Sequence, residues 1–520
     1  MNARIIGIDL GTTNSCVAIL EGGEPVVIHN QEGGRTTPSM VSFNSQGEHV
    51  VGAASKRQAV TNAKSSLYGI KRLVGRRFRS AEVERLVKAV PYEIIEAQNG
   101  DAWVRVRDRD FSPEEISARV LEKMKQIAED YLGESITEAI ITVPAYFDDV
   151  QRQATKDAGT IAGLKVRAIL NEPTAAALAF GVHQQKNQRV AVFDLGGGTF
   201  DISILAIESG VFEVLAVSGD TFLGGDDFDR RVIELLVREF RAQHAVNLQD
   251  DPVALQRLKE AAERAKIELS SALVTDINLP FVAVGAEGGP LHMQRELKRN
   301  ELVSLCSDLL LRLEGPCKRA LADARLIAKD IDQVVLVGGM TRMPAVQEKV
   351  EEIFGKKPSK GVNPDEIVAI GAATQSGIMG GELQEVILLD VTPKSLGVKV
   401  AGDKVSVLIP RNTTVPTREQ KTFATTEPNQ EFVAIEIVQG EEQAASKNRL
   451  LGRFILGDIT RAPAGQVRVE VSFSIDADGI LHVSATEQAT GKATSLTVQA
   501  HGGLSSHEVA RLAAQHAQAR

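Results

Sequence analysis

The feature that most constrains this chain is a run of three glycines between two apolar, β-branched segments. Residues 189–193 lead into Asp194-Leu195-Gly196-Gly197-Gly198-Thr199-Phe200-Asp201, and residues 202–207 lead out of it, which predicts strand, tight turn and strand. Without Cβ atoms, the turn can bring its N–H groups close to a bulky anion. Carboxylates at both ends of the turn suit a phosphate only when a divalent cation lies between them. The loop therefore predicts a Mg-nucleotide site, and a plain glycine-rich hairpin turn is the alternative.

A second copy of this pattern stands near the start of the chain. Asp9-Leu10-Gly11-Thr12-Thr13-Asn14 repeats residues 194–199, with an acid at the end of a strand and then a turn of small residues. The sequence contains neither a Walker-A motif nor a GxGxxG fingerprint. Two matched loops that face each other across a cleft would hold a triphosphate from both sides. Asp9 and Asp194 would then hold the metal through its water molecules.

The order of strand and helix patterns divides the 520 residues into two parts. From Arg4 to about Gly380, short β-branched runs alternate with helical patterns, such as residues 149–162 and 251–271, which is typical of an α/β fold. After Gly381 the alternation has a period of two, as in residues 467–475, which predicts an antiparallel β domain.

Charge and cysteine content exclude several classes of protein. A net charge of −9 gives no reason to expect a nucleic acid or a membrane as partner. Three scattered cysteines cannot form a disulfide framework, and the N-terminus enters a strand without an apolar signal-peptide stretch. We therefore expect a cytoplasmic protein.

Four further motifs make a family resemblance specific. Together with the two loops, the chain resembles the seventy-kilodalton heat-shock chaperone family of the bacterial DnaK type, from Ile5 to about Leu504. The motifs are Ile141-Thr142-Val143-Pro144-Ala145-Tyr146-Phe147, residues 151–159, residues 171–177 and Leu336-Val337-Gly338-Gly339-Met340-Thr341-Arg342.

The resemblance implies a division of the chain. It implies an actin-like ATPase domain with two lobes and a duplicated core in residues 1–381, an interdomain linker in 382–391, an antiparallel β-sandwich peptide-binding domain in 392–502 and the truncated start of a helical lid in 503–520. It also implies ATP and ADP as ligands with Mg²⁺, and K⁺ as a possible further ion.

The resemblance assigns four residues to catalysis. Lys71 would orient the attacking water and offset charge at the γ-phosphoryl group, Glu172 and Asp201 would order metal-bound waters, and Thr199 would lie beside the γ-phosphate. Slow turnover is expected, because no strong nucleophile is evident. The implied nucleotide-binding residues are Gly11, Thr12, Thr13, Asn14, Gly196, Gly197, Gly198, Thr199, Gly224, Gly225, Glu263, Lys266, Ser270, Gly338, Gly339, Arg342 and Asp365.

One of these assignments has a competing interpretation, and one neighbouring residue departs from the family. Glu263, Lys266 and Ser270 share one helix face, which periodicity alone would interpret as a salt-bridged surface stripe rather than an adenosine contact. Met340 stands where the family usually carries a polar residue, so the fine contacts to the nucleotide differ there.

The β domain is expected to bind extended, apolar peptide segments of unfolded proteins. Ala401 and Thr426 match the two residues that arch over the peptide; both are small or polar here. Five further residues match the family's peptide pocket and cleft, and their alternative role is ordinary sandwich core. They are Val398, Phe423, Val433, Ile435 and Val469.

Between the two parts, Val386-Ile387-Leu388-Leu389 resembles the family's allosteric linker. An apolar run outside a core is costly to solvate, so it should dock as an added strand in one nucleotide state and be released in the other. The alternative is the first strand of the β domain.

Two substitutions concern partners. Ala168 stands where DnaK-type members carry an arginine that engages J-domain co-chaperones, and Asp148 replaces the usual asparagine. We expect an ATP-dependent chaperone with a nucleotide-exchange factor and a weakened J-domain partner. The alternatives are a small-molecule kinase of the actin-like superfamily and a non-hydrolysing, nucleotide-gated scaffold.

Overall fold

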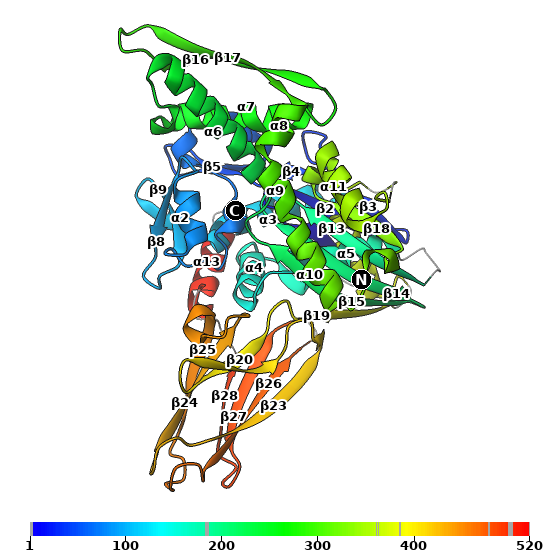
Figure 1. Ribbon diagram of the computed structural model, residues 1–520, viewed down its shortest axis with the longest axis vertical. Helices are drawn as coiled ribbons and strands as arrows, with labels where there is room; N and C mark the ends of the chain where they lie inside the picture. The colour runs from blue at the N-terminus through cyan, green and yellow to red at the C-terminus, as the bar shows by residue number, and fades with distance from the viewer. Residues whose placement is uncertain are drawn as a thin grey trace.

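The computed structural model describes residues 4–181, 187–359, 361, 363–383, 386–476, 479–497 and 503–518. Helices and mixed sheets occupy the upper part of Figure 1, and two β-sheets from the C-terminal part of the chain lie below them. Among the described residues, none of the helices is both long enough and apolar enough to cross a membrane.

The first large sheet contains the first phosphate-loop candidate. Its strand β1 runs parallel to β11 and antiparallel to β2, and β4 (Thr37–Pro38) pairs with β2. The main order is β12 (Lys165–Asn171), β11 (Glu138–Val143), β1 (Ile5–Asp9), β2 (Asn14–Glu21) and β3 (Glu24–Val27).

The second large sheet repeats this pairing. Strand β13 runs parallel to β18 and antiparallel to β14, so the loops β1–β2 and β13–β14 occupy equivalent positions. The predicted strand, turn and strand is thus confirmed at both copies. The order is β18 (Gln333–Val337), β13 (Gln188–Leu195), β14 (Phe200–Glu208), β15 (Val211–Asp220), β19 (Ile387–Val391) and β22 (Thr414–Val415).

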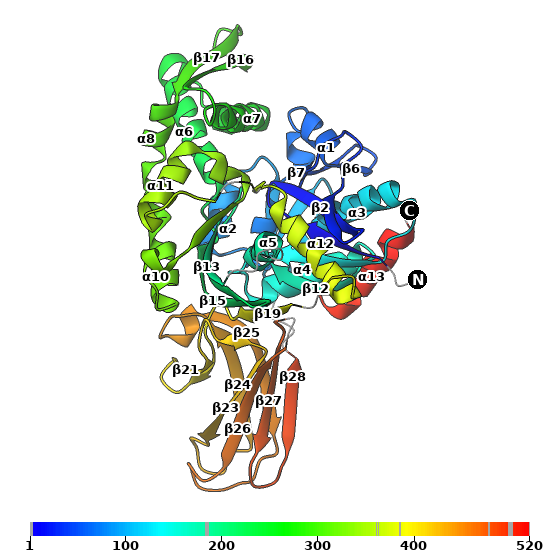
Figure 2. The same ribbon diagram turned by 90° about the vertical axis from the view of Figure 1, so that its right-hand side faces the viewer.

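Two central helices lie between these sheets. Helix α12 (Ile367–Gly380) packs on β1 and β2, α5 (Glu172–Gly181) packs on β13 and β14, and the two helices contact each other (Figure 2). Both are apolar all round, which is typical of helices buried between layers. Glycine at position 371 allows this contact, because a Cβ there would lie 1.9 Å from the Ala175 carbonyl oxygen.

The predicted helices agree with the structure. Helix α4 (Asp149–Ile161) starts at the N-cap Asp148 with a complete capping box, and α7 (Pro252–Glu268) starts at Asp251. The other helices near the first sheet are α1 (Ala53–Gln58), α2 (Ala81–Val87) and α3 (Pro113–Leu132). Those near the second sheet are α6 (Gly225–His244), α8 (Arg299–Leu305), α9 (Ser307–Arg312), α10 (Glu314–Asp323) and α11 (Pro344–Phe354).

Three small sheets extend the upper region. The long hairpin of β16 (Val274–Val284) and β17 (Pro290–Lys298) projects from the top of Figure 1 beside α7. The other two sheets comprise β5 (Val41–Phe43), β6 (His49–Val51) and β7 (Ser66–Leu67), and β8 (Glu93–Glu96), β9 (Ala102–Val106) and β10 (Arg109–Phe111).

Two four-stranded antiparallel sheets form the C-terminal β region and share one hydrophobic cluster. The predicted period-two segment is β26, whose alternate residues from Val469 to Ile475 are buried. One sheet contains β21 (Lys404–Ile409), β20 (Leu396–Val400), β24 (Phe432–Gln439) and β25 (Arg449–Gly457). The other contains β23 (Thr417–Ala424), β26 (Arg468–Ile475), β27 (Leu481–Glu487) and β28 (Ala493–Thr497).

Strand β19 connects the two parts through backbone pairing. It runs parallel to β15 on one side and antiparallel to β22 on the other. Val386 and Leu388 pack on the cluster beneath the second sheet, so the apolar run is docked. Residues 384 and 385 of the expected linker lie outside the described residues.

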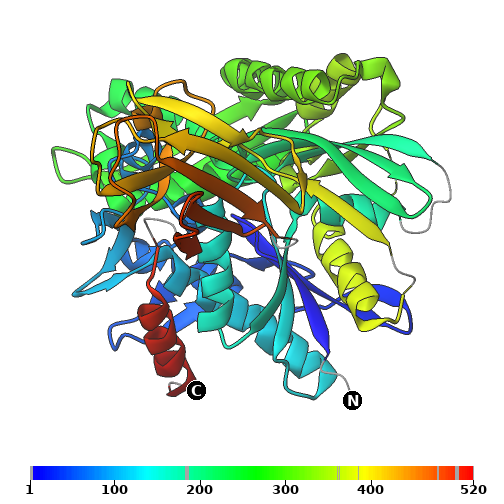
Figure 3. The ribbon, with the colours of Figure 1, turned by 90° about the horizontal axis from the view of Figure 1, so that it is seen from below.

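The last helix packs on the part of the molecule that contains the first large sheet. Helix α13 (Ser506–Gln518) packs on α4, and its Val509 and Leu512 are buried in the cluster of the first sheet (Figure 3). His516 Nδ1 lies 2.9 Å from Glu122 Oε1 on α3. The capping box of Ser505 and Glu508 opens this helix.

Candidate functional site

A cavity of about 370 Å³ lies between the two equivalent loops. Its walls come from β1–β2, from β13–β14, from the starts of α5 and α6, and from α7 and η5 (Gly339–Arg342). The structure brings most of the expected residues to this cavity. They are Asp9, Gly11, Thr12, Thr13, Asn14, Lys71, Glu172, Asp194, Gly196, Gly197, Thr199, Gly225, Glu263, Lys266, Gly338, Gly339, Arg342 and Asp365.

Close contact between the two loops explains the demand for glycine. A Cβ at Gly197 would lie 1.9 Å from Thr13 Oγ1 of the first loop, and one at Gly11 would lie 2.0 Å from the Asn14 carbonyl oxygen within its own loop. No side chain fits at either position. The backbone amides of both loops can therefore approach a single anion from opposite sides.

Buried carboxylates crowd the end of this cavity. Burial and then the Glu172 carboxylate raise the pKa of Asp9 to about 7, and the same two causes raise the pKa of Asp201 to about 8. For Asp194, burial followed by the charges of Glu172 and Asp201 raises the pKa well above its usual range. The cluster thus has more negative charge than its surroundings stabilise.

This cluster suits a hydrated divalent cation. Within the described part of the chain, no group of three or more His, Cys, Asp or Glu side chains is arranged to ligate a metal directly. Asp9 and Asp194 both line the cavity, where carboxylates can bind the water shell that Mg²⁺ retains. The donor set fits Mg²⁺ bound through water.

Lys71 brings a positive charge to the same place. It lies in η2 (Ile70–Arg72), and its Nζ donates to Glu172 Oε1 at 2.6 Å and to the Leu10 carbonyl oxygen at 2.7 Å. The side chain is 9 % exposed, so the ion pair with Glu172 is buried. The pair holds the ammonium group close to the first loop.

The opposite end of the cavity is bordered by α7. Lys266 Nζ lies 2.7 Å from Asp229 Oδ1 and donates to the Gly225 carbonyl oxygen, while Glu263 pairs with Lys56 at 2.9 Å. Ser270 does not line the cavity. Helix α7 ends at Glu268, so Ser270 lies in the following turn and donates to the Lys266 carbonyl oxygen.

Three other expected residues lie behind the cavity wall rather than on it. Asp201 is buried and accepts from the Tyr146 amide, Gly198 lies under the Arg72 side chain, and Gly224 is the N-cap of α6. The cavity also includes residues that the motifs did not indicate, among them Thr36, Asp226, Asp229 and Ile267. The acids after Gly224-Gly225 were a usable signal for the start of α6.

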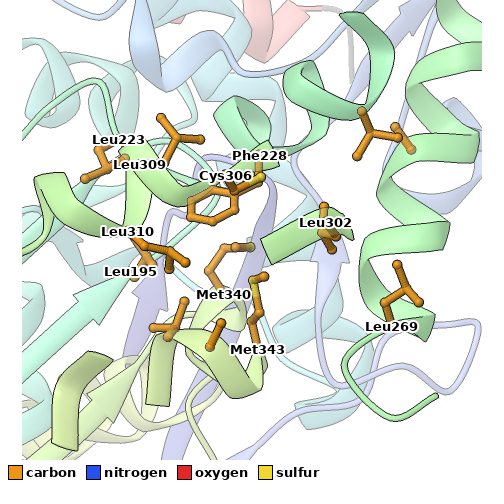
Figure 4. Packing of buried hydrophobic residues seen from close by; sticks show 14 of the residues in the cluster. Leu195, Leu223, Phe228, Leu269, Leu302, Cys306, Leu309, Leu310, Met340 and Met343 are labelled. Atoms are coloured by element: carbon orange, nitrogen blue, oxygen red, sulfur yellow. The ribbon is translucent and has the colours of Figure 1, made fainter. Parts of the chain in front are cut away.

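The environment of Met340 accounts for the methionine at a position where the family usually carries a polar residue. It is 6 % exposed and packs with Phe228, Cys306 and Met343 in the hydrophobic cluster of the second sheet (Figure 4). Its atoms also reach the cavity, where Sδ would lie 3.2 Å from a Cβ on Gly225. An apolar side chain suits this largely buried position.

The expected peptide-binding residues fall into three groups in the C-terminal β region. Val398, Ile435 and Val469 are buried in the shared cluster. Phe423 and Val433 pack against it but are only partly buried, and Ala401 and Thr426 are exposed. Partly exposed apolar side chains over a buried apolar floor are compatible with a peptide contact, although the buried three also serve as core.

Comparison with protein-family models supports the nucleotide interpretation of the cavity. The model of the family described as Hsp70 protein matches residues 5–520, which is nearly the whole chain. This match includes both loops, β19 and the C-terminal β region. The chain therefore belongs to the Hsp70 family, whose members are nucleotide-binding ATPases that act as ATP-dependent chaperones.

Proposed function

We propose that hydrolysis of ATP in the cavity between the two loops controls how tightly the C-terminal β region holds apolar peptide. In this proposal the two large sheets are the cores of two lobes of an actin-like ATPase domain, residues 1–381. Residues 382–391 are the linker, residues 392–502 form a peptide-binding β-sandwich, and residues 503–520 begin a lid. The first lobe carries β1 and α12, and the second carries β13 and α6.

The observation that carries the proposal is the double pairing of β19. Its residues 387–389 extend the sheet of the second lobe, and Asp390 and Val391 pair with β22 of the β region. A change in the lobe that releases β19 would therefore also change the position of the β region. Ile387 is 54 % exposed and the next three residues are only partly buried, so this part of the strand lies near the surface of the second sheet.

Lys71 is suited to position the attacking water. Its ammonium group has three N–H donors, and Leu10 and Glu172 accept two of them, which leaves one for water among the described contacts. Its charge would also offset the negative charge that develops at the γ-phosphoryl group. Mg²⁺ bound through water to Asp9 and Asp194 would stabilise the phosphoryl oxygens, while Thr199 lines the same cavity.

A short path joins this site to the linker. Asn171, next to Glu172, donates to Asp390 Oδ2 at 2.6 Å, and Thr174 donates to the same oxygen at 3.0 Å. Arg152 Nη2 donates to Asn171 Oδ1 at 2.6 Å. A shift of Glu172 on phosphate release would reach Asp390 through one peptide unit.

Ionic contacts between the β region and the ATPase domain support a docked state. Arg449 lies 3.4 Å from Asp148 and donates to the Gly75 carbonyl oxygen, and Arg411 pairs with Asp323 at 2.8 Å. Such contacts exist only in one relative position of the two parts, so nucleotide can shift the balance between positions.

The proposed partners are extended apolar peptides, a J-domain co-chaperone and a nucleotide-exchange factor. Val433 and Phe423 would contact the peptide, with Ala401 and Thr426 above it. Ala168 on β12 and Ile480 of the β region both line a small pocket between the two parts. Without the arginine side chain we propose that J-domain contact there is weaker.

Steady-state phosphate release tests the proposal. ATP turnover that rises severalfold with an apolar peptide, and that Lys71→Ala abolishes, supports a peptide-coupled ATPase. Turnover that needs a sugar acceptor would indicate the kinase alternative. Nucleotide binding without turnover would indicate the scaffold.

A further inference from the structure

The largest unexplained feature is a second cavity between the lobes. Its volume is about 490 Å³, and it lies between α2 of the first lobe and α6 and α7 of the second. Tyr68 and Lys259 line this cavity and also a small pocket beside Thr12 and Thr13, so they stand between it and the phosphate loops. The Lys259 ammonium lies 3.5 Å from the centre of the Tyr68 ring. The cavity is thus separate from the nucleotide cavity but close to it.

One wall of this cavity is apolar and aromatic. Tyr68 and Tyr92 pack edge to face with ring centroids 5.5 Å apart, and the Tyr92 hydroxyl donates to the Tyr68 carbonyl oxygen. Leu86 lines the same side, and Ile233 and Leu255 face it from the second lobe. This space suits a flat apolar group.

The polar groups favour a negative charge on the ligand. The acids of the wall already have cationic partners: Asp227 accepts from Arg72 at 2.7 Å and from Arg230 at 3.0 Å, and Asp226 lies 3.6 Å from Lys259. Arg72 is 7 % exposed and lines the cavity, but its guanidinium is already paired, with Nη2 2.7 Å from Asp227 Oδ2 and Nε 3.8 Å from Asp226 Oδ2. The wall is therefore close to neutral, and the preference for an anion comes from the cations at the mouth of the cavity.

Two further cations stand at the mouth. Arg85 and Lys88, at the end of α2, are exposed and line the cavity. Within the described chain, neither makes an ion pair within 4.0 Å. They would attract an anion to the entrance, while Glu234 is the acid at the same rim.

We propose that this cavity binds a small flat apolar acid, an aromatic carboxylate or sulfonate, and that the bound acid slows nucleotide release. The ring lies between Tyr92 and Ile233, and the acid group faces Arg85 and Lys88 at the mouth. Because the walls come from both lobes, the ligand contacts all of them only while the lobes are closed. Its binding therefore favours the closed state that retains nucleotide.

The binding half of this inference does not depend on the proposed function. Calorimetric titration of the nucleotide-free protein with 2-naphthoate should give one site with a Kd on the order of 0.1–1 mM. The cationic analogue 2-naphthylmethylamine should bind at least ten times more weakly. Equal affinity of acid and amine, or no heat with the acid, would overturn the proposal.

Substitutions in the cavity test whether 2-naphthoate binds there. Ala89→Trp should fill the cavity and abolish binding, and Lys88→Glu, which changes an exposed residue, should weaken it about fivefold. Arg238→Glu changes an exposed charge on α6 outside the cavity and should leave the affinity unchanged. If Ala89→Trp and Lys88→Glu both bind the acid normally, the probe lies elsewhere and the assignment is wrong.

The inference that the bound acid slows nucleotide release rests on the proposed function, and it is tested by a separate measurement. Release of a fluorescent ADP analogue should slow severalfold at saturating 2-naphthoate in the unaltered protein and not in Ala89→Trp. Normal probe binding with unchanged release would overturn the regulation while keeping the site. A protein that binds the probe but hydrolyses no ATP would contradict the proposed function and leave the site standing.

Discussion

The side-chain amide of Asn171 donates to the Asp390 carboxylate at 2.6 Å, and the residue after Asn171 is Glu172, which accepts from Lys71. One peptide unit thus separates the buried ion pair of the nucleotide cavity from the strand that pairs with both parts of the molecule. Under the proposed function, this relationship would make β19 sensitive to small movements in the cavity.

Asp390→Ala should uncouple peptide binding from nucleotide while leaving ATP affinity nearly unchanged. The substitution removes the acceptor of both Asn171 and Thr174, and hydrogen bonds to a charged group contribute about 1.5–3 kcal/mol each. We expect the stimulation of ATPase activity by peptide to fall at least tenfold. Asp108→Ala, in the exposed turn between β9 and β10, is the matched control and should behave like the unaltered protein.

Lys71→Met should reduce kcat by a factor on the order of 10² to 10³, because it removes a preorganised charge at the phosphoryl group. It also leaves Glu172 buried without its cation. Nucleotide affinity, measured by calorimetry, should change much less than kcat. Lys64→Met replaces an exposed lysine of the same lobe and serves as control; turnover equal in both variants would show that the catalytic centre is elsewhere.

Stability of the nucleotide-free protein should fall as the pH rises. The pKa of Asp201 is about 8 in the folded chain against an ordinary value of 3.8, so the folded chain holds a proton that the unfolded chain releases between these values. The free energy of unfolding therefore decreases across this range. Calorimetric scans should show a lower Tm near pH 8 than near pH 5, and a weaker pH dependence in Asp201→Asn.

Mg²⁺ should offset part of the loss of stability that a rise in pH causes. The pKa of Asp9 is about 7, and a nearby cation favours its ionised form. Binding of Mg-nucleotide should therefore release protons, and its affinity should increase as the pH rises from about 6 to about 8. Titration in two buffers of different ionisation enthalpy measures the proton release. Proton uptake, or affinity independent of pH, would contradict the charge balance described for this cluster.

Arg449→Met should favour separation of the β region from the ATPase domain. Asp148 is 2 % exposed, and Arg449 is the first attractive charge that lowers its pKa, so the docked state would retain a buried carboxylate with less compensation. Arg449 is 20 % exposed, so losing this partner should cost about 1–3 kcal/mol. Energy transfer between dyes on the two parts should fall, and the double variant with Asp148→Asn should recover part of it.

Val433→Phe should weaken peptide binding without changing ATP affinity. Val433 is only partly buried above the shared cluster, so a larger ring occupies the space that an apolar peptide side chain would use. We expect a loss of about tenfold in affinity, measured by fluorescence anisotropy. Phe432→Ala alters the adjacent exposed side chain on the other face of β24 and should have little effect.

The local elements of this fold were predictable from the sequence because their signals are local. Three glycines require a close approach of backbone, and that approach exists between Gly197 and Thr13. The alternation in residues 467–475 became β26, and the box of Asp148 and Gln151 starts α4. The strand and the start of the helix depend on neighbours within a few residues, and the contact of Gly197 with Thr13 was indicated by the repeated loop motif.

The long-range contacts were not predictable in the same way. No motif indicated Arg72, which reaches from η2 to the carbonyl oxygens of Gly197 and Gly198 in the second loop. Helix α13 carries an ordinary amphipathic pattern that does not indicate its packing on α4. Such contacts depend on how distant segments meet, and periodicity contains no information about that.

The most direct test of the central claim is the affinity of a fluorescent apolar peptide for the protein with ATP and with ADP. The account predicts weaker binding and faster release with ATP, since nucleotide would act on the β region through Asp390 and β19. Equal affinity and equal release rates in the two nucleotide states would contradict it.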